Sequence, residues 1–175
     1  MADTSHKAAS QTLREIASWQ PGRGSADSDL LPELSTMVAR SRDLSRNHGI
    51  ASGAMQTLTD NIVGTGFRLS AKPDYKLLGK TKDWEEEWQA KVEGLWRSWS
   101  ETFMCDAAQS LNFHGLTTQV FKSCLINGEA LALALWLPER PVATTIRLIE
   151  PDRLSNPNNS TDTKMLRGGV EIDRF

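Results

Sequence analysis

The segment that most constrains this fold is residues 40–73, with the sequence RSRDLSRNHGIASGAMQTLTDNIVGTGFRLSAKP. It contains two helix-like patterns, separated by Gly49 and ended by Gly64 and Gly66. Glycine commonly stops a helix because it adopts left-handed backbone conformations without steric cost. Between the glycines, apolar residues repeat every four positions, which predicts a helix with one apolar face. These residues are Ile50, Ala54, Leu58 and Ile62.

The residues before this segment predict a mobile arm and then a helix. Residues 1–30 are polar and lack apolar periodicity, so we predict a flexible N-terminal arm. From about 32 to 47 a loose apolar stripe predicts the first helix, and Pro32 suits its first turn. The stripe consists of Leu34, Met37, Val38 and Leu44.

Two further helices are predicted downstream by apolar residues at helical spacing. The first carries four of the six tryptophans, at Trp84, Trp88, Trp96 and Trp99. Aromatic residues at this spacing are typical of a core, although tryptophan is also enriched where subunits pack. The second runs from Phe113 to Leu125 and ends at Asn127-Gly128, with Cys124 on its apolar face.

Short strands are predicted where apolar and other residues alternate. Residues 67–71 alternate in this way, as do 131–137, 146–148 and the start of a strand at 170–172. We therefore predict an α+β fold, in which N-terminal helices are followed by helices mixed with short, mostly antiparallel strands. The 175 residues suffice for one sizeable domain, which we place at 31–175.

Composition and net charge limit the kinds of partner that the chain can have. No apolar run approaches the ~20 residues of a membrane helix, and the polar start is not a secretory signal, so we expect no membrane partner and a cytosolic setting. The net charge is -2. Proteins that grip DNA non-specifically usually carry a basic excess, because their affinity comes from neutralised phosphates. The charge balance therefore does not favour a surface that grips DNA.

Four segments of the sequence, in the same order, resemble the N-terminal part of tailed-phage portal proteins of the lambda family. They are 24–34 (GSADSDLLPEL), 40–73, 105–129 (CDAAQSLNFHGLTTQVFKSCLINGE) and 148–158 (LIEPDRLSNPN). The resemblance implies that residues 31–175 form a portal wing-like domain. It also implies that the stem, clip and crown of such proteins lie beyond residue 175, as in a truncated prophage gene or a chain shortened by design.

What the resemblance implies for function is structural. Full-length relatives form a ring, usually a dodecamer, at one vertex of the virion capsid, and DNA is packaged and ejected through the ring. The expected partners are other copies of the chain, the terminase motor, capsid and head-completion proteins, and DNA passing non-specifically through the channel. Assembly would occur in the host cytoplasm. The alternative is a prophage-derived module that binds proteins but does not assemble into a ring.

Candidate catalytic and ligand-binding patterns are weak. Gly79-Lys80-Thr81 resembles the end of a phosphate-binding loop, but position 74 is Asp where that loop needs glycine. Ser100 or Ser123 with His114 lacks a nucleophile elbow. The cysteines and histidines lack zinc-site spacing. We therefore predict that the chain is not an enzyme and has no catalytic, cofactor or metal site.

Charged residues provide the remaining candidates. Arg40, Arg42 and Arg46 lie on the first predicted helix, and the acidic residues Glu85, Glu86 and Glu87 lie near the start of the tryptophan-rich one. Three interpretations remain open for the arginines. They could form a solvated basic face, pair across a subunit interface with Glu85–Glu87 of a neighbouring copy, or contact DNA phosphates.

Overall fold

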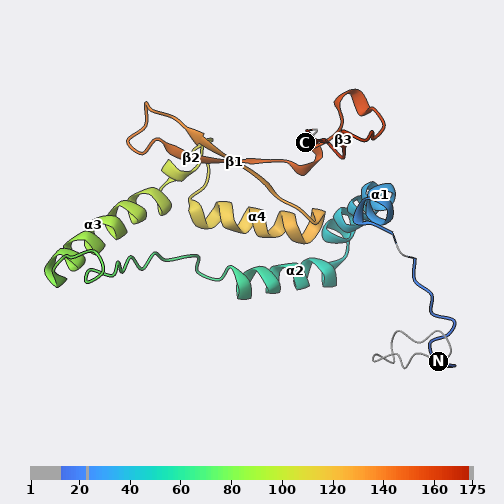
Figure 1. Ribbon diagram of the computed structural model, residues 1–175, viewed down its shortest axis with the longest axis horizontal. Helices are drawn as coiled ribbons and strands as arrows, with labels where there is room; N and C mark the ends of the chain where they lie inside the picture. The colour runs from blue at the N-terminus through green and yellow to red at the C-terminus, as the bar shows by residue number, and fades with distance from the viewer. Residues whose placement is uncertain (1–12, 23, 174–175) are drawn as a thin grey trace. The chain divides into compact units, whose positions relative to one another are not determined.

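The computed structural model describes residues 13–22 and 24–173. The chain divides into two compact units, Met1–Ser35 and Thr36–Phe175. The described residues contain four α-helices and two small antiparallel strand pairs (Figure 1), which confirms the predicted α+β class. No described helix combines the length and apolar character that crossing a membrane requires.

Helix α1 (Ala26–Asn47) begins earlier than the sequence predicted. Within the first unit, the Ser25 hydroxyl oxygen accepts the N–H of Ser28 at 3.2 Å and so satisfies one donor of the first helical turn. Pro32 therefore lies inside the helix rather than in its first turn, where it removes one helical hydrogen bond. Residues 1–12 and 23 of the predicted arm lie outside the described residues, and the flexibility of the arm stays a prediction.

Helix α2 (Gly49–Ile62) forms as predicted, but it packs through a different face. The buried side lies one position after the predicted stripe, at Thr59 and Val63, and Gln56 at its edge accepts a hydrogen bond from Lys122 of α4. Thr59 can turn inward because its hydroxyl donates to the carbonyl oxygen of Met55 at 2.7 Å. The predicted apolar stripe is left in solvent.

The strand predicted at 67–71 is wrong. Among the described residues this segment has no strand partner, and Phe67 and Leu69 are exposed. The Ala71 N–H instead donates to the Glu93 carboxylate at 3.1 Å. Alternation alone could not reveal that a side chain, rather than a neighbouring strand, satisfies this backbone.

The predicted tryptophan helix and the helix after it are confirmed as α3 (Lys82–Ser100) and α4 (Phe113–Asn127). Each begins with a polar cap, Thr81 for α3 and Asn112 for α4, and α4 ends at Gly128 in the left-handed region (φ 82°). Their contact contains an aromatic cluster whose ring centroids lie 5.2–5.5 Å apart. The cluster consists of Trp96, Trp99 and Phe113.

The larger sheet contains β1 (Leu131–Trp136) and β2 (Thr144–Ile149), paired antiparallel with Leu133 opposite Arg147. Figure 1 shows this sheet on one side of α4 and α2 on the other. The indole N–H of Trp99 donates to the Thr144 carbonyl oxygen at 2.8 Å and ties α3 to β2. A second hairpin, β3 (Leu166–Arg167) and β4 (Val170–Glu171), turns through two glycines with positive φ.

Three short 3-10 helices complete the described elements: η2 (Phe103–Cys105), η3 (Pro151–Arg153) and η4 (Pro157–Asn159). The fully packed core is small. Among the described apolar residues, those buried are Val63, Ala71, Cys105, Leu116 and Pro151. Many larger ones are exposed, including Leu77 at 85%. Cys124, predicted on an apolar face, is also exposed, because α4 turns that position to solvent.

Candidate subunit interface

Arg42 is occupied within its own chain. Its guanidinium donates two hydrogen bonds to the Asp152 carboxylate, at 2.7 and 2.8 Å, and a third to the Asn127 side-chain oxygen at 2.7 Å. The Asp152 hydrogen bonds raise the pKa of Arg42, and the Arg42 hydrogen bonds lower the pKa of Asp152. These three hydrogen bonds form a fork that joins α1, the end of α4 and η3. One of the three candidate arginines therefore has a structural role within the chain.

Sequence reasoning singled out Arg42 but missed both of its partners. Asp152 lies in the 148–158 segment, directly after Pro151, which begins η3. Asn127 was recognised only as part of a helix stop. The available signal was an acidic residue in the first turn of a short helix, but its arginine partner lies 110 positions away and no local pattern links them.

Arg40 and Arg46 remain on the surface. Both are exposed, and within the described residues neither takes part in an ion pair or a hydrogen bond from its side chain. Each charge is therefore available to a partner outside the chain. The structure confines the basic surface of α1 to these two residues.

The acidic residues lie at the N-terminal end of α3. Glu86 and Glu87 are exposed, whereas Glu85 is half-buried. Glu86 lies 3.6 Å from the ammonium group of Lys82, a pair exposed on both sides and therefore weak. In the described part of the chain, no ion pair joins these glutamates to the arginines of α1.

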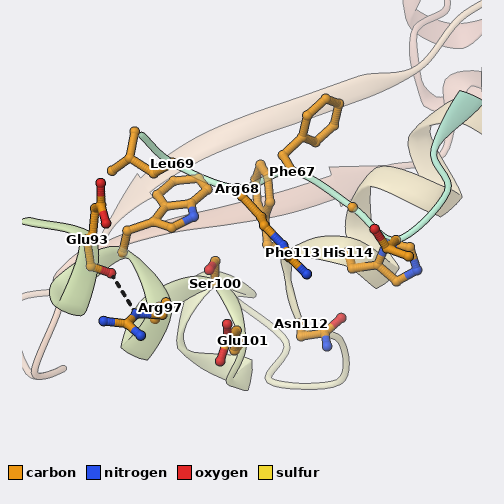
Figure 2. Close-up of a pocket in the computed structure, with 13 residues that line it drawn as sticks. Phe67, Arg68, Leu69, Glu93, Arg97, Ser100, Glu101, Asn112, Phe113 and His114 are labelled. Atoms are coloured by element: carbon orange, nitrogen blue, oxygen red, sulfur yellow. Dashed lines mark hydrogen bonds between the residues drawn. The ribbon is translucent and has the colours of Figure 1, made fainter. Parts of the chain in front are cut away.

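A hollow of about 560 Å³ lies between the 65–69 segment, α3 and the start of α4. Figure 2 shows Arg68, Arg97, Glu93 and Glu101 around it, so cationic and anionic side chains are balanced. Arg97 donates to the Glu93 carbonyl oxygen at 3.4 Å. The hydrogen bond from the Ala71 N–H lowers the pKa of Glu93, and one from Gln89 adds to it.

Ser100 and His114, one of the serine–histidine pairs that could suggest a hydrolase, both line this hollow. Figure 2 shows them on different sides of the hollow, and no hydrogen bond joins them in the described residues. Ser100 is buried, and the His114 ring packs close to Gly66, where an added Cβ would lie 2.9 Å from Nδ1. The pair therefore lacks the nucleophile–base contact that acyl transfer needs.

The Gly79-Lys80-Thr81 sequence has structural roles. The Asp74 carboxylate accepts the N–H groups of Lys76 and Leu77 at 3.0 and 3.1 Å, so these donors do not face a phosphate. Thr81 caps α3, and the Lys80 ammonium lies 5.8 Å from the centre of the Trp84 ring. In the part of the chain described, no three His, Cys, Asp or Glu side chains gather as ligands for a metal ion.

Asp106 organises the turn between α3 and α4, a role that the sequence did not predict. Its buried carboxylate accepts three backbone N–H groups at 2.9–3.1 Å, those of Ala108, Ser110 and Leu111. Burial raises the pKa of Asp106, but these hydrogen bonds outweigh it, so the pKa lies below its ordinary value. Arg140 donates to the adjacent carbonyl oxygens of Asp106 and Ala107, both at 2.8 Å.

Comparisons with known proteins identify the family of this chain. The family model described as phage portal protein, lambda family, matches residues 12–175. The chain is 36% identical over 163 residues to the portal protein of Escherichia phage N15, and 34% identical over 163 residues to portal protein B of Escherichia phage lambda.

Both alignments cover 91% of this chain and 31% of the relative, so the chain spans about a third of the length of the curated relatives it matches. The expected resemblance, including its restriction to the N-terminal portion of those proteins, is confirmed. The chain belongs to the lambda family of phage portal proteins.

Proposed function

We propose that this chain serves as the N-terminal, wing-like part of a portal ring at one capsid vertex, through which DNA is packaged and ejected. The family match across residues 12–175 carries this proposal. Both relatives are named as portal proteins. The non-assembling binding module is not favoured, because neither comparison points to such a protein.

The partners follow from this role. As a full-length protein the chain assembles with other copies of itself into a dodecamer. The ring is a docking point for the terminase motor, the capsid shell and the head-completion proteins, and DNA passes through it non-specifically. Assembly takes place in the host cytoplasm. The near-neutral charge of the chain supports a surface over which DNA slides.

Arg40 and Arg46 of one copy pair with Glu86 and Glu87 of the next. All four side chains are exposed, and the arginines take part in no ion pair within the described chain. Opposite charges on two different surfaces suit a cyclic assembly, in which each subunit offers one face to the neighbour on either side. Arg42 has no part in this pairing, since Asp152 already occupies it.

The chain has no catalytic role in this proposal, and transport depends on shape and charge. The Asp74-capped turn before Lys80 and the separation of Ser100 from His114 support this. We expect purified protein to show no saturable ATP hydrolysis. Hydrolysis that disappears in Lys80→Ala but persists in Lys91→Ala would contradict a purely structural role.

The test of the portal role is location in the particle. Purified virions or proheads that contain this chain would be labelled with a gold-conjugated antibody against it, with an antibody against the shell protein as control. We expect a single label at one vertex per particle. Label spread over the shell, or absence of the chain from particles, would overturn the proposal.

A further inference from the structure

Helix α2 carries two apolar or small-residue stripes, and the chain uses only one. The stripe that ends in Thr59 and Val63 is buried at 4% and 8% exposure. The adjacent stripe, one residue earlier at each turn, is open to solvent: Ile50 is 81% exposed, Leu58 43% and Ile62 61%. Together with Ala54, these residues form a continuous apolar face, because positions four apart lie above one another on a helix. We call it the α2 stripe.

The composition of α2 is that of an interface rather than of a solvated helix. Among its 14 residues, GIASGAMQTLTDNI, the only charged residue is Asp60. A helix face that remains in water normally carries several charges, whereas the centre of a protein interface is depleted of them. The α2 stripe therefore has the character of a surface that another protein covers.

The basic end of α1 borders this stripe. Arg46 lies four residues before Ile50, and only His48 separates the two helices. The surface thus combines an apolar centre with the exposed Arg46 beside its first residue. A partner that fits it needs exposed apolar residues next to carboxylates.

Helix α3 offers such a surface. Trp88 and Leu95 are 37% and 58% exposed, and because they are seven residues apart they lie on the same face. Glu87 borders this face and is exposed, and the exposed Lys91 lies between Trp88 and Leu95. Trp96 and Trp99 of the same helix instead pack on Phe113 within the chain.

One copy does not bring these two surfaces together. In the Thr36–Phe175 unit, Figure 1 shows α3 toward one end and the junction of α1 with α2 toward the other. Two unlike, complementary surfaces at separate places on one subunit are what a head-to-tail contact requires, and repeated head-to-tail contacts form a ring when the rotation between neighbours closes.

We propose that the α2 stripe of one copy packs against the Trp88–Leu95 face of α3 in the next copy, with Arg46 opposite Glu87. This inference rests on the proposed portal role and specifies the apolar centre of its subunit contact. The occupant of the α2 stripe is thus a second copy of this chain, oriented head to tail.

The test uses two variants, each blocked on one surface. Leu58→Gln with Ile62→Gln blocks the α2 stripe, and Trp88→Gln with Leu95→Gln blocks the α3 face. We expect the parent chain to self-associate as concentration rises in sedimentation velocity. Each variant alone should have its association weakened by at least about tenfold, because each has lost one half of the contact.

Mixing the variants distinguishes head-to-tail contact from other arrangements. Each still has the surface that the other lacks, so the equimolar mixture should form a discrete heterodimer that neither variant forms alone. Leu133→Gln, an exposed β1 residue outside both surfaces, is the control and should associate like the parent. Circular dichroism melting of every variant verifies that the fold is retained.

Three results would overturn the inference: a parent chain that stays monomeric at all accessible concentrations, variants that associate like the parent, or a mixture that gives no heterodimer. Monomeric parent protein would point to another occupant, such as a further segment of a longer polypeptide. If any of these occurs while gold labelling still marks a single vertex, the interface is wrong and the portal role stands.

Discussion

Apolar residues pack against one another at the α3–α4 junction, whereas an apolar stripe on helix α2 is exposed to solvent. At the junction, Trp96, Trp99 and Phe113 close on one another, and the Asp106 carboxylate satisfies three backbone donors beside them. On α2, a complete apolar stripe faces solvent. Apolar residues at equally regular helical spacing are therefore packed in the core in one helix and exposed on the surface in the other. The difference shows that periodicity identifies an apolar face but not what covers it.

The strongest way to sharpen this comparison is to remove the carboxylate at the junction. Asp106→Ala removes the acceptor of three part-buried backbone hydrogen bonds, and we expect a loss of about 3 kcal/mol in the free energy of unfolding. Urea denaturation monitored by tryptophan fluorescence measures it. Asp83→Ala, in the exposed first turn of α3, should change stability by about 0.5 kcal/mol. Equal losses in the two variants would show that the junction is not specially organised.

The same carboxylate predicts a pH dependence. The pKa of Asp106 is lower in the folded state than in the unfolded chain. Its contribution to stability is therefore present above the ordinary aspartate value of about 4, and it is lost as pH falls through the folded pKa. The difference in unfolding free energy between the parent and Asp106→Asn should thus shrink between neutral pH and about pH 3. A difference that grows on acidification would contradict the lowered pKa.

Packing at the junction should be the next largest effect. Phe113→Ala removes a half-buried ring that touches two tryptophans, and we expect a loss of about 2–3 kcal/mol. Phe103→Ala is the matched control, because Phe103 is 55% exposed and should lose well under about 1 kcal/mol. Chemical denaturation of both variants, side by side, tests whether burial rather than residue type sets the cost.

A smaller effect is expected at the fork between α1 and η3. Arg42→Lys keeps the charge but loses the two-pronged contact with Asp152 and the bond to Asn127, which should cost about 1 kcal/mol. Arg46→Lys, without an intrachain partner in the described residues, should leave the unfolding free energy unchanged. If the two substitutions have the same effect, Arg42 is not the structural residue that its contacts indicate.

The smallest expected effect is a gain. The Thr145 hydroxyl oxygen is buried and has no hydrogen-bond partner in the described structure. Thr145→Val keeps the shape and removes the unpaired polar group, so we expect a stabilisation of about 0.5–1 kcal/mol. Thr144→Val, at an exposed neighbouring position, should be close to neutral. Destabilisation by Thr145→Val in thermal melts would indicate that the hydroxyl has a partner in solution.

The elements with strong local signals could be predicted from the sequence. The tryptophan helix has a cap at Thr81, α4 has its cap at Asn112 and its stop at Gly128, and the leucine alternation after residue 130 became β1. Each of these signals acts within a few residues. The family resemblance rested on four ordered segments and was likewise accessible without the structure.

What could not be predicted depends on distant contacts. The extended 67–71 segment alternates like a strand, yet its Ala71 N–H bonds a carboxylate 22 residues away. Arg42 had three plausible roles by sequence, and only the fold reveals Asp152 as its partner. The four-residue period of the α2 stripe predicts a face packed within the chain. The buried face instead carries Thr59, a polar residue.

The central claim is that the α2 stripe is built for a neighbour and not for the core of its own chain. The most direct test compares Leu58→Asp with Leu116→Asp in equilibrium denaturation at a protein concentration low enough to keep the chain monomeric. Leu116 is 4% exposed, so a charge there should cost several kcal/mol and abolish cooperative unfolding. Leu58→Asp should change the unfolding free energy by less than about 1 kcal/mol. A loss at Leu58 as large as that at Leu116 would show that α2 packs through the stripe within the monomer, and would contradict the claim.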